Sequence, residues 1–268
     1  LLQEKKMARI CPLFSGSSGN STYIGGASGG ILIDAGMSFK TIKEALIKSG
    51  SDIENIKAIA VTHEHYDHIK GLKVLLKQTK VPVIASEKTL KALETAQLIP
   101  ESTKEIAADN SELEIGDFII SRFATSHDCE GSSGYSVNLA GGKKITVCTD
   151  LGIISDEVRN ALNKSDIVLI ESNHDIDMLK RGPYPPKLKL RILSDKGHLS
   201  NTACAVELPE LLNSGTTRFI LGHLSRHNNL PMLAFSKAKS ALADCGAEID
   251  CDYILKIAKP SDNEVMTI

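Results

Sequence analysis

The chain has 268 residues, of which 42% are hydrophobic, and a formal net charge of −2. A chain of this size can bury a full hydrophobic core, which favours a globular enzyme or binding protein. The small net charge excludes a general attraction to nucleic acid or anionic membranes, so any basic surface must be local. No apolar run approaches the roughly 20 residues of a membrane span. The start of the chain also lacks the apolar region of a signal peptide, so we expect a cytoplasmic protein without membrane contact.

Short apolar runs alternate with helical patterns along the chain. We expect strands at 30–36 and 56–63 and, between them, a helix at 38–50 that Ser38 caps. A helix from Ile69 and a strand at 81–86 follow. The expected antiparallel strands of the middle are 117–127, 134–140 and 143–150. The expected elements of the last part are the helix 155–164, the strand 166–172, the helix 201–213, the strand 217–223 and a helix around 234–245.

This alternation with a β-rich middle predicts a sheet-based α/β sandwich with helices on its outer faces. No linker interrupts the pattern, so we predict one domain over residues 1–268. Residues 1–6 precede Met7 and carry no pattern, and we treat them as an extension outside the fold.

The segment VTHEHYDHIKG at 61–71 holds three of the chain's eight histidines and an aspartate. His63 and His65 stand two residues apart at a strand end, so their side chains leave the same side of the chain. Asp67 and His68 follow where the chain turns into a helix. Imidazole and carboxylate groups bind borderline divalent metals, so the spacing predicts a metal site, with solvated loop histidines as the alternative.

Three further candidate ligands each end an apolar strand: His127, Asp150 and His223. Strand ends are where open sheets place their chemistry. Any one of these residues alone would be a hydrogen-bonded structural residue. Together with the histidine-rich segment, they predict ligands for two metal ions.

The motif HEHYDH, with those three residues, resembles the metal-binding set of the metallo-β-lactamase fold. More closely, FSGSSGNSTYI, ILIDAG, CTDLG, ESNHD, GPYP, ILSDKGHLSN and LGHLS resemble the YycJ/WalJ branch over about residues 8–250. Members of that branch are bacterial proteins associated with exonuclease activity on double-stranded DNA. The resemblance implies an αββα four-layer sandwich.

The resemblance also implies how two divalent ions would be held. Zn²⁺ and Mn²⁺ are the expected ions, and Fe²⁺ is a further candidate. One ion would be bound by His63, His65 and His127. The other would be bound by Asp67, His68 and His223. Asp150 would bridge the two. Asp67 and Asp150 would then orient the hydroxide that attacks phosphorus.

Glu171 and His198 lie outside this ligand set. In tRNase Z-type and other phosphodiesterase members of the family, an acidic residue and then a histidine precede the last ligand histidine and relay a proton to the leaving oxygen. By this resemblance Glu171 and His198 are catalytic residues, as is Asp67. A helix-entry role is the alternative for His198, and His174 is its rival for the relay. We expect His227 to be structural or at the surface.

The segment 178–196 is locally basic. Its candidate nucleic-acid contacts are Lys180, Arg181, Lys187, Lys189 and Arg191. Phosphate contacts of this kind would position a nucleic-acid backbone without reading bases. A solvated helix face is the alternative. The small residues of GSSGN at 16–20 permit a close backbone approach, but the segment lacks the lysine of a P-loop, so we expect an ordinary turn.

These patterns predict a phosphodiesterase that uses two divalent metal ions, with nucleic acid as its substrate. A 5′ to 3′ exonuclease on duplex DNA is the specific expectation, and it rests on the resemblance alone. The alternatives are an RNA-processing nuclease, a small-molecule hydrolase of a thioester, lactone or cyclic phosphodiester, and a regulator that uses its metals structurally. The sequence predicts no oligomeric state.

Overall fold

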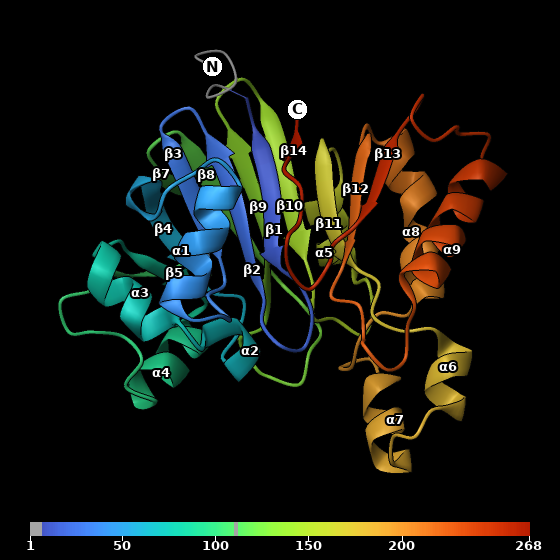
Figure 1. Ribbon diagram of the computed structural model, residues 1–268, viewed down its shortest axis with the longest axis horizontal. Coiled ribbons are helices and arrows are strands. Elements are labelled where there is room, and N and C mark those ends of the chain that lie inside the picture. Colours follow the sequence, from blue (N-terminus) through green and yellow to red (C-terminus); the bar gives the residue numbers. More distant parts are fainter. Residues whose placement is uncertain (1–6, 110–111) are drawn as a thin grey trace. The chain divides into compact units, whose positions relative to one another are not determined.

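The computed structural model describes residues 7–109 and 112–268. These residues group into two compact units (Figure 1). Unit 1 comprises the chain up to Phe123, together with Cys129–Lys143 and Lys259–Ile268. Unit 2 comprises Ala124–Asp128 and Lys144–Ala258. The single domain over residues 1–268 stays a prediction, and the extension 1–6 lies outside the described residues.

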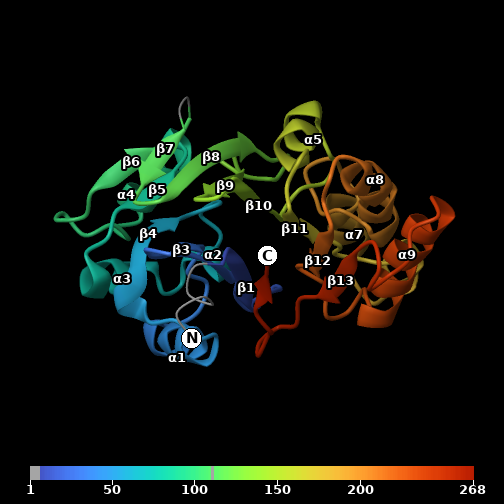
Figure 2. The same ribbon diagram turned by 90° about the horizontal axis from the view of Figure 1, so that it is seen from above.

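Unit 1 is built on a seven-stranded mixed sheet in the order β14-β1-β2-β3-β4-β5-β6, and Figure 2 shows β14 beside β1. The strands are β1 (Arg9–Phe14), β2 (Ser21–Gly26), β3 (Gly29–Ile33), β4 (Ile56–Ala60), β5 (Val83–Ala85), β6 (Glu105–Ala107) and β14 (Met266–Thr267). Strands β14 to β3 pair antiparallel, whereas β3 to β6 pair parallel. Parallel neighbours need crossovers. The helices in these crossovers are α1 (Phe39–Lys48), α2 (Tyr66–Ile69), α3 (Leu72–Thr79) and α4 (Glu87–Thr95).

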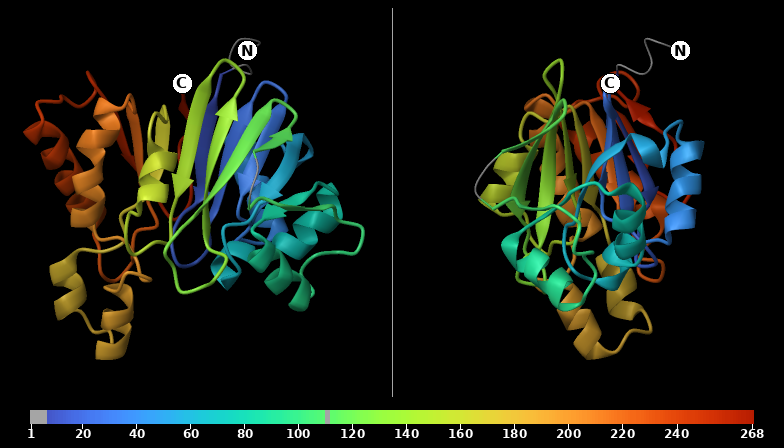
Figure 3. Two further views of the ribbon diagram at one scale, coloured as in Figure 1. Left: turned by 180° about the vertical axis from the view of Figure 1, so that it is seen from behind. Right: turned by 90° about the vertical axis from the view of Figure 1, so that its left-hand side faces the viewer.

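A second ladder of unit 1 contains β9 (Ser133–Leu139), β8 (Phe118–Ala124) and β7 (Leu113–Ile115), in that order. The first two are the long green strands of Figure 3. Tyr135 on β9 is fully buried, and its hydroxyl donates to the carbonyl oxygen of Val61 at 2.8 Å. A buried tyrosine hydroxyl needs such a partner. This bond ties the second ladder to the chain two residues before His63.

Unit 2 contains four parallel strands in the order β10-β11-β12-β13. They are β10 (Lys143–Cys148), β11 (Ile167–Glu171), β12 (Arg218–Gly222) and β13 (Ile254–Ile257). Cys148 pairs with Ile170, and Glu171 pairs with Gly222. The carboxyl ends of β10, β11 and β12 therefore meet at one edge, where open sheets place functional residues.

The helices of unit 2 are α5 (Asp156–Leu162), α6 (Ile176–Arg181), α7 (Pro186–Ile192), α8 (Asn201–Asn213) and α9 (Pro231–Asp244). Helices α8 and α9 pack against each other. The short helices α6 and α7 form a pair that stands away from α8 and α9 in Figures 1 and 3. None of the residues of α7 is buried, and Leu190 on it is 71% exposed.

The expected strands and helices are present, and Ser38 caps α1 by accepting a hydrogen bond from the backbone N–H of Thr41. The strands expected to reach His63 and His127 end earlier, at Ala60 and Ala124. The residues that lead from these strands to His63 and His127 form loops, so both side chains lie outside the sheet. The helix expected from Ile69 is divided into α2 and α3 around Gly71. Among the described helices, none combines the length and the apolar character that crossing a bilayer requires.

Gly36 lies where two segments of unit 1 approach most closely. A Cβ atom at this position would lie 1.7 Å from the carbonyl oxygen of Asp67 and 2.5 Å from the backbone nitrogen of Asn20. Next to it, the backbone N–H of Ala35 donates to the carbonyl of His68 at 2.7 Å. Only glycine therefore lets residues 35–36 lie against the loop that carries Asp67 and His68.

Substitution of Gly36 by Ala should displace this loop. Overpacking against backbone costs about 1–3 kcal/mol, so we expect a lower melting temperature together with a reduced metal content after reconstitution. Gly26→Ala is the matched control, because the nearest atoms to its Cβ would be side-chain atoms of Leu139 and Phe118, at 3.2 Å, rather than backbone. A Gly36→Ala protein with unchanged melting temperature and metal content would contradict this role.

Candidate functional site

Unit 1 carries four of the predicted site residues, which we call the unit 1 cluster: His63, His65, Asp67 and His68. His63 is fully buried, and His68 is almost so. Nε2 of His63 and Nδ1 of His65 lie 3.0 Å apart. The two imidazoles therefore aim ring nitrogens at a common point, as two ligands of one ion do.

Asp34, which follows β3 within the ILIDAG stretch, orients His68. Its Oδ1 accepts from the backbone N–H of Thr62 and its Oδ2 from the Thr62 hydroxyl, each at 2.8 Å. Nδ1 of His68 also lies 2.8 Å from Oδ2 of Asp34. An ionised carboxylate only accepts hydrogen bonds, so Nδ1 carries the proton and Nε2 keeps its lone pair. This is the arrangement of a metal-binding histidine.

The GSSGN segment folds as the expected turn, in which Gly19 N–H donates to the Gly16 carbonyl at 3.0 Å. Its last residue reaches the unit 1 cluster. Nδ2 of Asn20 lies 3.2 Å from Oδ2 of Asp67 and 3.0 Å from Nε2 of His68. The turn thus positions two of the candidate ligands through Asn20.

The other predicted residues belong to unit 2, and we call them the unit 2 cluster: His127, Asp150, Glu171, His198 and His223. Asp150 follows β10, Glu171 ends β11 and His223 follows β12. Their ligand atoms and one of His198 lie within 4.8 Å of one another. The ends of β10, β11 and β12 therefore bring these side chains of unit 2 together.

Glu171 is the centre of the unit 2 cluster and is fully buried. Its Oε1 lies 2.9 Å from Nδ1 of His198 and 2.7 Å from Nδ1 of His223. Its Oε2 accepts from the backbone N–H groups of Leu151, at 3.1 Å, and Leu199, at 3.0 Å. Burial by itself raises the pKa of Glu171, but the two imidazoles outweigh it and lower that pKa to about 2. Glu171 is therefore an ionised acceptor for four donors.

The same contacts set the states of the histidines. Burial lowers the pKa of His198, but the neighbouring Glu171 carboxylate raises it more, and the net shift is upward. Nδ1 of His127 lies 3.2 Å from the Gly197 carbonyl, which can only accept a hydrogen bond. His223 therefore holds a proton on Nδ1 and directs its Nε2 lone pair elsewhere, as His68 does in unit 1, whereas Nε2 of His127 lies 3.2 Å from Oδ1 of Asp128. Buried imidazole and carboxylate groups of this kind suit a site for two divalent metal ions.

Asp150 and His223 both adopt left-handed backbone conformations, with φ values of 58° and 54°. Such conformations are uncommon for residues other than glycine and persist when the surroundings hold them. Oδ1 of Asp150 lies 3.3 Å from Nδ1 of His223 and 4.0 Å from Nε2 of His127. The backbone is thus bent where it delivers these two side chains.

His174, the rival relay residue, is buried, and neither of its ring nitrogens has a hydrogen-bond partner among the described residues. Burial lowers the pKa of His174 to about 4. Glu171 therefore holds His198 rather than His174. His227 is exposed, as expected, with its ring 5.9 Å from that of Tyr184.

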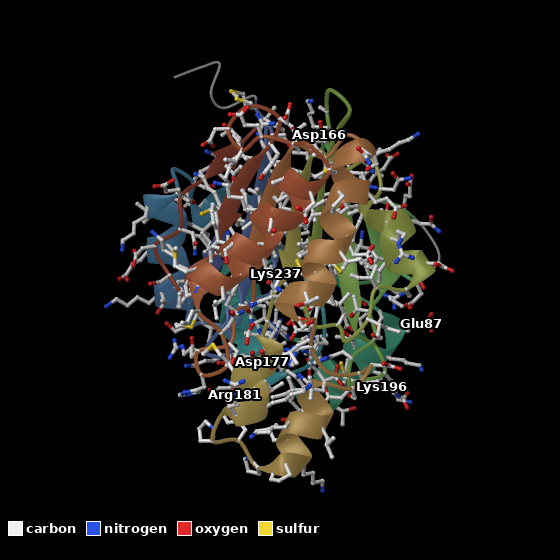
Figure 4. All side chains as sticks on the ribbon, turned by 90° about the vertical axis from the view of Figure 1, so that its right-hand side faces the viewer. Glu87, Asp166, Asp177, Arg181, Lys196 and Lys237 are labelled. Atoms are coloured by element: carbon white, nitrogen blue, oxygen red, sulfur yellow. The ribbon has the colours of Figure 1, made fainter. Side chains whose placement is uncertain are left out.

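Two of the five candidate phosphate contacts are engaged within unit 2. Arg191 forms an ion pair with Asp128, the neighbour of His127, and Nζ of Lys189 donates to the Lys180 carbonyl at 2.8 Å. The side chains of Lys180, Arg181 and Lys187 are exposed. Figure 4 shows Arg181 on α6 close to the acidic Asp177. The basic character of this segment is therefore weaker than its sequence suggests.

Comparison with known proteins places the chain in a family. Residues 30–224 match the family model of the beta-lactamase superfamily domain. The chain belongs to the metallo-β-lactamase superfamily. It is 36% identical over 258 residues to exodeoxyribonuclease WalJ of Streptococcus pneumoniae, which covers 95% of this chain and 96% of WalJ. It is 38% identical over 236 residues to exodeoxyribonuclease YycJ of Bacillus anthracis, covering 87% and 89% of the two chains.

The structure is similar to that of the metallo-beta-lactamase fold protein YhfI from Bacillus subtilis. The match has a TM-score of 0.75 at 17% identity and covers 98% of this chain and 100% of YhfI. The predicted fold class and the resemblance to the YycJ/WalJ branch are thereby confirmed, and the chain is a metallohydrolase of this fold. The individual ligand, catalytic and phosphate-binding assignments stay predictions.

Asp34→Asn should weaken metal binding, because an amide NH₂ in place of Oδ2 cannot accept the proton of His68 Nδ1. Loss of such a partner typically costs 10–100-fold in metal affinity. Chelator competition, followed by elemental analysis, measures the effect. Asp52→Asn, which removes a charge from a helix cap elsewhere in unit 1, should leave affinity unchanged. Equal affinities of the Asp34→Asn protein and the wild type would show that His68 needs no such partner.

Proposed function

We propose that the protein is a metal-dependent phosphodiesterase that degrades duplex DNA as a 5′ to 3′ exonuclease. The observation that carries this proposal is the buried Glu171 carboxylate, whose Oε1 holds Nδ1 of His198 beside the candidate ligand His223. An acid-oriented histidine next to a ligand histidine suits protonation of an alkoxide leaving group. The relatives named exodeoxyribonucleases support DNA as the substrate.

Seven residues would hold two divalent ions, Zn²⁺ or Mn²⁺: His63, His65, Asp67, His68, His127, Asp150 and His223. The donor types of the two clusters and family membership support this set. When bound, such ions polarise a phosphoryl oxygen and lower the pKa of a water molecule toward about 7. Asp67 and Asp150 would also orient the water that attacks phosphorus.

The proton for the leaving group would come from His198. Nδ1 of His198 is bonded to Glu171, and this carboxylate raises the pKa of the imidazole, which favours a second proton on Nε2. Its side chain is 21% exposed, whereas that of Glu171 is 0% exposed. His198 can therefore meet substrate while Glu171 stays buried behind it. Transfer of the Nε2 proton to the departing sugar oxygen, as the P–O bond breaks, leaves a neutral imidazole and an alcohol.

The direct test compares end-labelled duplex DNA, single-stranded DNA, RNA and a thioester, each with Mn²⁺ or Zn²⁺. We expect mononucleotides from the 5′ end of duplex DNA. Preferential cleavage of RNA would change the substrate class within the same chemistry. Thioester hydrolysis without phosphodiester hydrolysis would refute the proposal and favour the small-molecule alternative.

His198→Ala should leave the metal content unchanged and lower kcat about 10²–10⁴-fold on a substrate with a poor leaving group, the range for a lost general acid. A nitrophenyl phosphodiester needs little protonation of its leaving group, so it should lose far less. Single-turnover rates on both substrates measure the difference.

His174→Ala is the matched control, because His174 is also a buried histidine near Glu171 but holds no hydrogen bond through its ring within the described part of the chain. It should retain the wild-type ratio of the two rates. A leaving-group-dependent loss in His174→Ala, with none in His198→Ala, would transfer the relay to His174. If neither variant shows a leaving-group-dependent loss, neither histidine is the general acid.

We further propose that Lys180, Arg181, Lys187, Lys189 and Arg191 contact phosphates of the DNA. Since Arg191 and Lys189 also serve contacts within unit 2, the exposed residues give the cleaner test. Arg181→Ala with Lys187→Ala should flatten the slope of log affinity against log salt, by about 0.9 for each phosphate that the protein no longer neutralises.

The control variant, Lys237→Ala with Lys239→Ala, removes the same charge from exposed positions of α9, where Figure 4 labels Lys237. It should keep the wild-type salt slope and affinity. Hydrolysis of a small phosphodiester should be unchanged in both double variants. Equal salt slopes in the two double variants would show that the basic segment is a solvated helix face without phosphate contacts.

A further inference from the structure

The tetrapeptide Gly-His-Leu-Ser occurs twice in unit 2, at 197–200 and at 222–225. The first copy contains His198 and the second contains His223. Each copy delivers Nδ1 of its histidine to the same atom, Oε1 of Glu171. Two separate loops must therefore be held in matching positions on either side of one carboxylate.

The segment that follows Glu171 is bonded to both loops. Toward the first loop, Asn173 N–H donates to the Leu199 carbonyl at 2.8 Å. Toward the second, Ser172 N–H donates to the Gly222 carbonyl at 3.0 Å, and the Asn173 carbonyl accepts from Ser225 N–H at 2.8 Å. Asn173 thus contacts both copies through its backbone.

The side chain of Asn173 adds a contact to the second copy alone. Its Nδ2 donates to the backbone carbonyl of His223 at 2.8 Å, and the residue is 8% exposed. His223 has the uncommon φ of 54°. A buried donor aimed at the carbonyl of a left-handed residue offsets the cost of that conformation and fixes where its side chain points.

A buried amide network holds Asn173 in turn. Nδ2 of Asn229 donates to the Asn173 carbonyl and to the Ser172 carbonyl, both at 2.9 Å. Oδ1 of Asn229 accepts from Nδ2 of Asn201 at 2.8 Å. Because these partners come from all three segments, Asn173 has little freedom to move away from His223.

We infer that Asn173 is a positioning residue, which sets the direction of the His223 imidazole by holding the His223 carbonyl. With the carbonyl held, Nδ1 of His223 stays on Glu171 and its Nε2 stays available as a metal ligand. Glu171 in turn keeps the alignment in which it shares Oε1 with His198. This inference rests on the proposed function, since it takes His223 as a ligand and His198 as the relay acid.

The test uses three variants of the metal-loaded full chain. Asn173→Ala removes the donor, and Asn173→Asp keeps the size and shape but presents an acceptor to the His223 carbonyl. Asn228→Ala is the control: Asn228 is a buried amide of the loop that carries His223, and its Nδ2 donates to Ser225 Oγ at 3.4 Å instead. Zn²⁺ affinity is measured by chelator competition, and the imidazole N–H signals of ¹⁵N-histidine-labelled protein are followed by NMR.

We expect a 10–100-fold loss of Zn²⁺ affinity in Asn173→Ala, at least as large a loss in Asn173→Asp, and wild-type affinity in Asn228→Ala. The Nδ1–H signal of His223 should shift or broaden in both Asn173 variants. On a phosphodiester, kcat should fall while KM stays within about twofold, because substrate contacts are unchanged.

Wild-type behaviour of Asn173→Asp would show that Asn173 only fills space, and equal losses in all three variants would show general loosening of the loop. Either result overturns the inference. The affinity and NMR measurements need no substrate, so they separate this inference from the proposed function. A wild type that hydrolyses no phosphodiester, with the Zn²⁺ and NMR effects as expected, would refute the function and leave the positioning of His223 standing.

Discussion

The arrangement of unit 2 depends on the burial of one carboxylate. Placing an ionised Glu171 out of contact with water costs several kcal/mol unless its oxygens are fully bonded. Four donors meet that need, from Leu151, His198, Leu199 and His223. They come from three separate segments, so each segment must reach its position before the charge is tolerated. The same requirement, four donors for one buried carboxylate, therefore fixes both the fold of the strand ends and the geometry of the site.

Unit 1 uses the same device independently. Asp34 follows the buried strand β3 and accepts hydrogen bonds from the backbone N–H of Thr62 and from Nδ1 of His68. In both units a buried carboxylate fixes which imidazole nitrogen carries the proton, and so fixes the nitrogen that remains for a metal. The difference lies in number, because Asp34 orients one histidine through Oδ2 whereas Glu171 orients two through Oε1. Only the second arrangement adds a histidine beyond those proposed as ligands.

The sequence predicted most of the residues that meet in each unit, because strand ends and the H-x-H-x-D-H spacing follow the period of the backbone. It did not predict the partners that orient them. Asp34 carries the same signal as Asp150, a carboxylate after an apolar run, but it stands near no other candidate ligand in the sequence. Asn173 lies in the ESNHD motif, but its bond to His223 joins positions 50 residues apart, so the motif did not indicate its role. Such contacts depend on strand register, which local patterns leave open.

The shared oxygen of Glu171 changes how substitutions at this residue must be interpreted. If Glu171 oriented His198 alone, Glu171→Gln would mimic loss of His198 in a milder form. In the structure, an amide at this position would disturb His198 and His223 together, and it would also place a donor near two backbone N–H groups or two imidazoles. A loss of activity in Glu171→Gln would therefore combine displacement of the proposed acid with displacement of the proposed metal ligand. Only changes confined to one histidine can separate the two proposed roles, because Glu171 contacts both histidines.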